Sequence, residues 1–80
     1  MTVDQLLNVL YLMNSKVAAH VHDEIVRALA EDTLQHVIPA VRQYLIDHII
    51  VSVHYPTEQQ WEDHLDASYI LSLFKSVDWS

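Results

Sequence analysis

The chain contains no glycine in its 80 residues, and this absence limits both its turns and its chemistry. Glycine-rich loops that cradle phosphates, of the dinucleotide-binding type or the Walker type, cannot be built without glycine. A tight β-hairpin also loses its most tolerant turn residue, because glycine adopts positive φ angles at little cost. Several classes of nucleotide-binding enzyme are therefore excluded.

The length allows one small domain, and we treat residues 1–80 as a single unit. A chain of this size hides roughly 60 % of its unfolded surface, so its stability is marginal and a partner chain is expected. A content of 51 % hydrophobic residues is too apolar for a disordered tail. No apolar run approaches the roughly 20 residues of a membrane span. Cysteine is absent, which excludes disulfides and thiolate zinc sites.

Eleven acidic residues and four basic residues give a net charge of −7. Four scattered bases cannot form the basic patch with which a domain binds nucleic acid by itself. The N-terminal segment carries Asp4 and no cluster of positive charge, unlike a secretory signal. A cytoplasmic location without a membrane partner is therefore expected.

Apolar residues at steps of three and four predict a first helix over residues 3–13. They are Val3, Leu6, Leu7, Leu10 and Met13. The polar residues 14–16 predict a break, because Asn and Ser compete for backbone hydrogen bonds.

Residues 17–30 fit two structures. As a helix, this segment places its apolar residues on one stripe. As a β-hairpin, apolar residues alternate along two arms around a polar tip, His22-Asp23-Glu24, which lacks a glycine or asparagine for the turn. The local pattern taken alone favours the helix.

A second periodic segment predicts a helix over residues 31–49, capped by Asp32 or Thr33. Pro39 lies inside it and predicts a kink or a later start of the helix, because proline lacks the backbone donor, and we expect the kink. Residues 49–53 are rich in β-branched side chains and could extend into a short strand.

Tyr55-Pro56-Thr57 predicts a break at residues 54–57. Thr57 then caps a short helix that runs to about Asp66, with Trp61 and Leu65 on one side. Residues 69–77 alternate in a way that predicts a terminal strand.

Six histidines would allow a zinc site, with His20, His22 and Glu24, or His20 with Glu24 alone, as its ligands. Surface or half-buried polar roles are the usual explanation for such residues. No His-Glu-x-x-His motif is present, and the other four histidines fall at separate points of the pattern (His36, His48, His54 and His64). The pair Asp23-Glu24 differs in kind. Adjacent carboxylates at a hairpin tip repel each other unless solvent or a divalent cation neutralises them, whereas on a helix they lie on its solvated face.

Residues 19–26, Ala-His-Val-His-Asp-Glu-Ile-Val, resemble motif C of the family A DNA polymerases. In that motif an apolar strand leads into His-Asp-Glu and a second apolar strand leaves it. The order of the flanking elements is similar, and residues 73–78 look like the closing strand of the mitochondrial gamma type. Family members are several hundred residues long, so the chain resembles only their C-terminal palm-subdomain piece. The resemblance favours the hairpin at residues 17–30.

The resemblance implies a role for each residue of the tripeptide. Asp23 would be a catalytic residue and one of two aspartates that hold a pair of Mg²⁺ ions. Glu24 would assist catalysis near the metal, and His22 would contact the primer terminus. A larger polymerase chain would supply the remaining palm, the fingers, the thumb and the positive surface for primer-template DNA and dNTP. Because the chain begins at Met1 just before the motif, we expect a separately encoded small subunit, of phage origin and inactive alone.

The resulting prediction is an α+β palm fragment with a helix, a β-hairpin, a kinked helix, a short helix and a terminal strand. The exposed faces of residues 6–13 and 61–74 would dock on the larger chain. The alternative is an all-α small helical bundle, an acidic phage-type protein that binds and inhibits a host factor, with mimicry of the charge of DNA as one route. A helix that continues through Asp23 favours this alternative, and a hairpin with Asp23 at its tip favours the polymerase.

Overall fold

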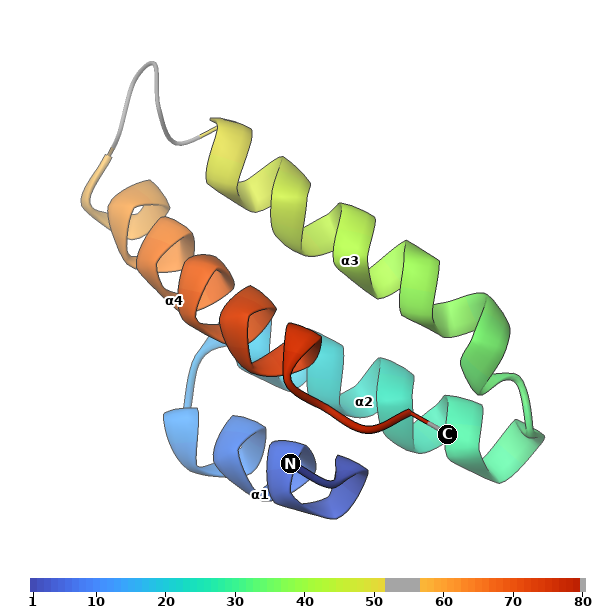
Figure 1. Cartoon of the computed structure of the whole chain (residues 1–80). Coiled ribbons are helices and arrows are strands. Elements are labelled where there is room, and N and C mark those ends of the chain that lie inside the picture. Colours follow the sequence, from blue (N-terminus) through green and yellow to red (C-terminus); the bar gives the residue numbers. More distant parts are fainter. Residues whose placement is uncertain (52–56, 80) are drawn as a thin grey trace.

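The computed structural model describes residues 1–51 and 57–79, and over that range it is a bundle of helices (Figure 1). The helices are α1 (Val3–Met13), α2 (Lys16–Glu31), α3 (Leu34–Val51) and α4 (Glu58–Lys75). No strand occurs among these described residues. The predicted α+β palm fragment is therefore wrong, and the fold is the all-α alternative.

Helix α1 confirms the prediction over residues 3–13. It begins with a capping box, in which the Thr2 hydroxyl accepts a hydrogen bond from the Gln5 N–H at 3.1 Å. The Gln5 side-chain oxygen in turn accepts from the Thr2 N–H at 2.8 Å. Two backbone donors that the helix itself cannot pair are satisfied in this way.

Two turns show how the chain changes direction without glycine. Asn14 (φ 50°) and Asp32 (φ 56°) both adopt the left-handed conformation that glycine usually takes at a helix end. Asn and Asp tolerate it because their short polar side chains bond locally. Ser15 then caps α2, its hydroxyl accepting from the Ala18 N–H at 3.1 Å. The predicted break is confirmed at residues 14 and 15, whereas Lys16 already belongs to α2.

Helix α2 runs through the segment for which the hairpin was predicted, so that prediction is wrong. Five of its apolar side chains recur at helical spacing and have almost all of their surface buried (Val17, Ala18, Val21, Ile25 and Ala28), whereas Val26 and Leu29 are partly exposed. A hairpin would turn half of these side chains away from the core and would need a turn at residues 22–24 without glycine or asparagine. The local 3.6-residue period decided the conformation here.

Helix α3 confirms the predicted helix but begins later, at Leu34. Asp32 ends α2 instead of capping α3, and the Thr33 carbonyl accepts from the His36 N–H at 3.0 Å. Pro39 lies inside the helix, which continues on both sides of it.

The predicted short strand at residues 49–53 is wrong for Ile49 to Val51, which are helical. The rest of that strand, and the predicted break before Thr57, lie outside the described residues.

Helix α4 replaces a predicted short helix and a predicted terminal strand with one continuous element. Ala67, Ile70 and Phe74 are buried, at steps of three and four, whereas Ser72 is exposed. The strand pattern would have placed Ser72 on the same face as Ile70 and Phe74. Helical spacing therefore accounts for the burial, and the strand prediction is wrong.

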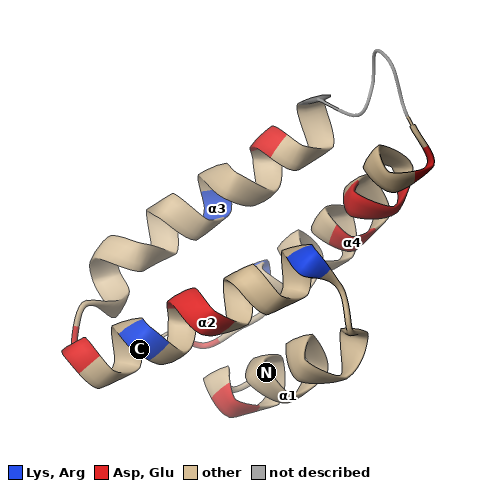
Figure 2. Cartoon of the chain, turned by 180° about the vertical axis from the view of Figure 1, so that it is seen from behind, with Lys and Arg blue, Asp and Glu red and all other residues tan. Residues whose placement is uncertain are grey.

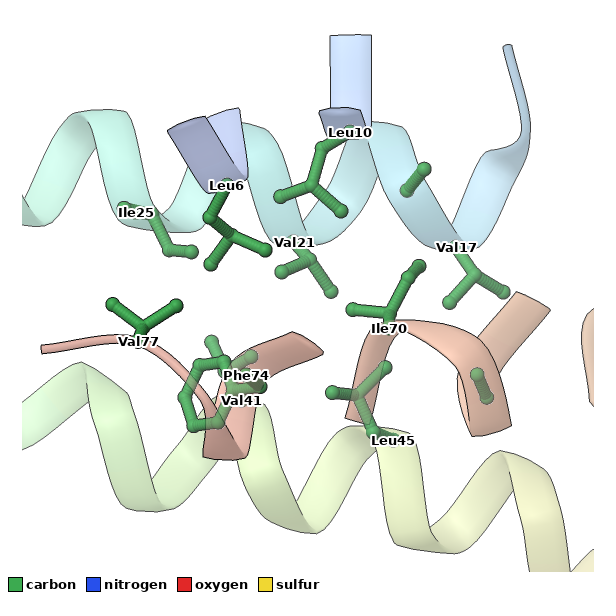
Figure 3. Close-up of a cluster of buried hydrophobic side chains, with 12 residues drawn as sticks. Leu6, Leu10, Val17, Val21, Ile25, Val41, Leu45, Ile70, Phe74 and Val77 are labelled. Atoms are coloured by element: carbon green, nitrogen blue, oxygen red, sulfur yellow. The ribbon is translucent and has the colours of Figure 1, made fainter. Parts of the chain in front are cut away.

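One hydrophobic core joins the helices (Figure 3). Helix α2 contacts all three other helices, and α3 and α4 pack along each other. The close-up labels the core residues Leu6, Leu10, Val17, Val21, Ile25, Val41, Leu45, Ile70, Phe74 and Val77.

The two ends of the chain are bound to each other. The N-terminal ammonium group of Met1 donates to the Ser76 carbonyl at 3.0 Å. The Asp78 N–H donates to the Met1 carbonyl at 2.9 Å. Trp79 lies on Phe74 with ring centroids 4.7 Å apart, and its Nε1 donates to the Phe74 carbonyl at 3.1 Å. These contacts close the bundle over the N-terminal end of α1.

Candidate functional site

The residues that resemble a polymerase motif lie in the middle of α2. Successive residues of an α-helix are rotated by about 100° about its axis, so the side chains of His22, Asp23 and Glu24 leave the helix in three directions. The segment thus presents no tip at which the two carboxylates meet.

Asp23 faces solvent, with 82 % of its side chain exposed. Its carboxylate lies 3.3 Å from Nδ1 of His22. Glu24 is more enclosed, and its carboxylate forms an ion pair with Arg27 one turn further along. Each of the two predicted catalytic acids therefore has a local partner of its own on a different side of α2.

An open groove of about 490 Å³ lies beside Asp23, at the corner between α1 and α2. Its lining includes Tyr11, Lys16, His22 and Asp23. The rings of Tyr11 and His22 are 6.3 Å apart. The groove brings one basic, one acidic and two aromatic groups together.

The predicted zinc ligands do not form a cluster. Within the two described stretches, no group of three or more His, Cys, Asp or Glu side chains is placed to hold a metal ion. His54 lies outside those stretches. The predictions of zinc at His20, His22 and Glu24, and of Mg²⁺ at Asp23, therefore gain no support.

Four of the histidines contact other aromatic rings. Tyr44 lies between His20 and His48, with ring centroids 4.2 Å and 4.3 Å away. His64 stacks on Trp61, with centroids 5.5 Å apart and the ring planes 11° from parallel. Nδ1 of His64 donates to a backbone carbonyl of α3 at 3.2 Å. The fourth, His22, meets Tyr11 in the groove described above.

The surroundings of Tyr44 change the pKa of its phenol. Its partial burial raises the pKa of Tyr44, and the negative charge of Asp63 raises it further. Both causes favour the neutral phenol at physiological pH.

The exposed face that was predicted over residues 61–74 takes the form of a helical stripe on α4, on the side away from the core. Trp61, Leu65 and Tyr69 follow one another at steps of four residues, and their exposed fractions are 52 %, 51 % and 53 %. We call these three residues the outer face of α4. The sequence analysis assigned Tyr69 to a strand, so it could not join the other two in one stripe. The signal was present in the four-residue spacing, which continues across Ala67 and Ser68.

The first half of α4 is also strongly acidic (Figure 2). Its sequence holds four acids before any lysine or arginine, Glu58, Glu62, Asp63 and Asp66. The amide of Gln59 donates to the Asp63 carboxylate at 2.9 Å. On α3, the amide of Gln43 donates to Asp47 at 2.8 Å. Neutral amides therefore orient the carboxylates of Asp47 and Asp63.

Comparisons of the chain with protein-family models, with characterised proteins and with solved structures give no significant match. No family match therefore supports the resemblance to the polymerases, which stays a prediction. Among the helices of the described residues, none has the length and apolar character needed to cross a membrane.

Proposed function

We propose that this chain is a small acidic helical protein that binds a positively charged surface of another protein and thereby inhibits that protein. The proposal depends on one observation. The chain is a bundle of helices whose eleven acidic residues far outnumber its four lysines and arginines. The phage-type inhibitor is thus the function that the fold supports best.

The conformation of α2 favours this function over nucleotidyl transfer. The polymerase role required Asp23 at the bend between two strands, where it could share Mg²⁺ ions with carboxylates of a second chain. In α2, Asp23 instead projects from a continuous helix and pairs with His22. The polymerase function stays a prediction, without the hairpin on which it depended.

The amide-held carboxylates support a partner of positive charge. The carboxylates of Asp47 and Asp63 accept hydrogen bonds from neutral glutamine amides. Ordered negative charge attracts a basic surface over several ångströms and speeds the encounter with it. Proteins that bind nucleic acids carry such basic surfaces, so a chain of net charge −7 can occupy the site of the nucleic acid.

Co-purification of the tagged full chain from its native source tests the proposal. Mass spectrometry should identify a protein with a basic surface, and binding should weaken when the salt concentration rises to about 0.5 M, because screening then acts within a few ångströms. Adding the purified chain should displace nucleic acid from that partner.

A charge variant provides the matched control. Asp47→Asn combined with Asp63→Asn keeps the shape of both side chains and removes two charges, so binding should weaken and depend less on salt. Recovery of a chain that carries the missing palm, fingers and thumb would contradict the proposal, as would a neutral partner held independently of salt.

A further inference from the structure

We propose that the outer face of α4 is the docking surface for the partner, and that it receives a basic amphipathic helix of that protein. This inference rests on the proposed function and assigns it to one surface.

The fold does not account for the exposure of the outer face. The opposite side of α4 supplies the core through Ala67, Ile70 and Phe74, which are buried. Trp61, Leu65 and Tyr69 remain about half exposed in one stripe. Large aromatic residues grouped on a surface are typical of binding hot spots.

Trp61 is held in one orientation before any partner arrives. Its indole stacks on the His64 imidazole. That imidazole is itself tied to the end of α3, because Nδ1 donates to the Ile49 carbonyl. An anchor that is already ordered loses less conformational entropy when it binds.

The charges beside the stripe select a basic occupant. Glu58 and Glu62 are exposed and lie on the same side of α4 as the outer face, and Lys75 is the first basic residue of this helix. A second copy of the chain would bring the same acids and a net charge of −7, so like charges disfavour self-association through this face.

The spacing of the stripe selects a helical occupant. Residues four apart form a ridge along an α-helix, and such a ridge packs into the groove between the ridges of another helix. Trp61, Leu65 and Tyr69 form one such ridge over two turns. An amphipathic helix with apolar residues on one side and lysines or arginines at its margins complements both the ridge and the acids.

Within residues 1–51 and 57–79, the exposed apolar side chains of α1 and α2 do not form an equivalent ridge. Tyr11 and Leu12 are 75 % and 71 % exposed but adjacent in α1, so their side chains point about 100° apart. Val26 and Leu29 on α2 flank the basic Arg27. Tyr11 and Leu12 therefore provide the matched control for the loss of exposed apolar surface.

The test uses a synthetic peptide of about 18 residues, composed of leucine and lysine, with the leucines on one helical face. Its affinity for the full chain is measured by isothermal titration calorimetry. Leu65→Ser combined with Tyr69→Ser should weaken binding about tenfold or more. Tyr11→Ser combined with Leu12→Ser should leave the affinity unchanged. Circular dichroism checks that both double variants keep the helical fold.

The charge arm uses Glu58→Gln combined with Glu62→Gln, which should weaken binding of the leucine–lysine peptide and reduce its salt dependence. A lysine-only peptide of the same length should bind the unmodified chain at least about tenfold more weakly, because it lacks the apolar face. Equal binding of the two peptides would overturn the inference. So would failure of the leucine–lysine peptide to bind, or equal losses in the α1 and α4 variants.

These outcomes separate the surface from the function. Co-purification of a basic partner whose affinity is insensitive to the α4 substitutions would reject the docking surface and retain the proposed function. Peptide binding that depends on α4, together with a native partner that is not basic, would retain the surface as a binding site and reject the function.

Discussion

The middle of α2 and the first half of α4 both carry clustered acidic residues, but the two clusters differ in their surroundings. On α2, Glu24 is neutralised by Arg27 and Asp23 lies beside His22. On α4, the amide of Gln59 holds Asp63 without neutralising it, and exposed aromatic residues lie alongside. A cluster of acids beside basic residues therefore indicates local ion pairing, whereas a cluster beside exposed aromatic residues indicates a binding surface.

The residue types of a motif are weaker evidence of function than the charge and the exposure of the residues around it. His-Asp-Glu on α2 has the residue types of a metal site, but helical geometry separates its side chains. The outer face of α4 matches no motif, yet it combines exposure, order and uncompensated charge.

The inner and outer faces of α4 should differ most in their contribution to stability. Phe74→Ala removes a buried ring and should lower the free energy of unfolding by about 3–5 kcal/mol, enough to unfold much of a marginally stable chain. Tyr69→Ala, on the exposed side of the same helix, should cost far less. Urea denaturation followed by circular dichroism measures both variants. Equal losses would show that Tyr69 belongs to the core.

Proline substitutions test the continuity of α2 and α4 at the two points where the sequence analysis placed a bend. Asp23→Pro and Ser68→Pro should each lower the free energy of unfolding by about 3 kcal/mol or more, because each removes a helical hydrogen bond and introduces a clash. Lys16→Pro and Glu58→Pro occupy the first helical position of α2 and α4, where proline is well tolerated.

Thermal unfolding of these four variants measures the difference. If Asp23→Pro is as mild as Lys16→Pro, residues 17–30 do not form a continuous helix.

The N-caps of α2 and α4 should contribute about equally to the free energy of unfolding. Ser15→Ala and Thr57→Ala each remove a hydroxyl that accepts from a backbone N–H at 3.1 Å. Each should lower the free energy of unfolding by about 1 kcal/mol. Urea denaturation measures the loss of unfolding free energy, and Ser72→Ala at an exposed position of α4 serves as the control. A cost at Ser72 as large as at the caps would mean that the capping bonds add nothing.

The smallest expected effect is the dependence of stability on pH through the phenol of Tyr44. Because burial and the charge of Asp63 raise its pKa, the folded chain keeps the phenol proton to a higher pH than the unfolded chain does. Tyr44 therefore contributes stability that is present below the ordinary phenol pKa of about 10 and is lost as the pH rises through the raised value.

Ultraviolet titration of the phenols should show that Asp63→Asn lowers the pKa of Tyr44. Asp47→Asn is the matched control and should leave it in place. An unchanged titration in Asp63→Asn would contradict the electrostatic contact.

The sequence was sufficient for α1 and for most of α3, because each has a clear helical period next to a polar turn. At α2 the same period was present, but the resemblance to a polymerase motif led to the wrong choice. At α4, the run Tyr69-Ile-Leu-Ser-Leu-Phe is apolar on nearly every side, so it fits a strand as well as a helix. Burial of Ile70 and Phe74 by the other helices decided between them, and a single sequence does not display that packing.

The candidate site was less predictable than the fold. Exposure of Asp23 follows from the helical alternative, in which the acids occupy a solvated face. The outer face of α4 required Tyr69 to share a helix with Trp61, and the stacking of His64 on that indole depends on the position of α3. Periodicity and composition do not predict contacts between helices that are distant in the sequence.

The most direct test of the account is an NMR titration of the isotopically labelled full chain with the leucine–lysine peptide, which maps binding residue by residue. The largest changes in chemical shift should occur at the Trp61 indole N–H and the amides of Leu65 and Tyr69. Changes concentrated instead at Tyr11 and His22, in the groove beside Asp23, would contradict the assignment of the docking surface to α4.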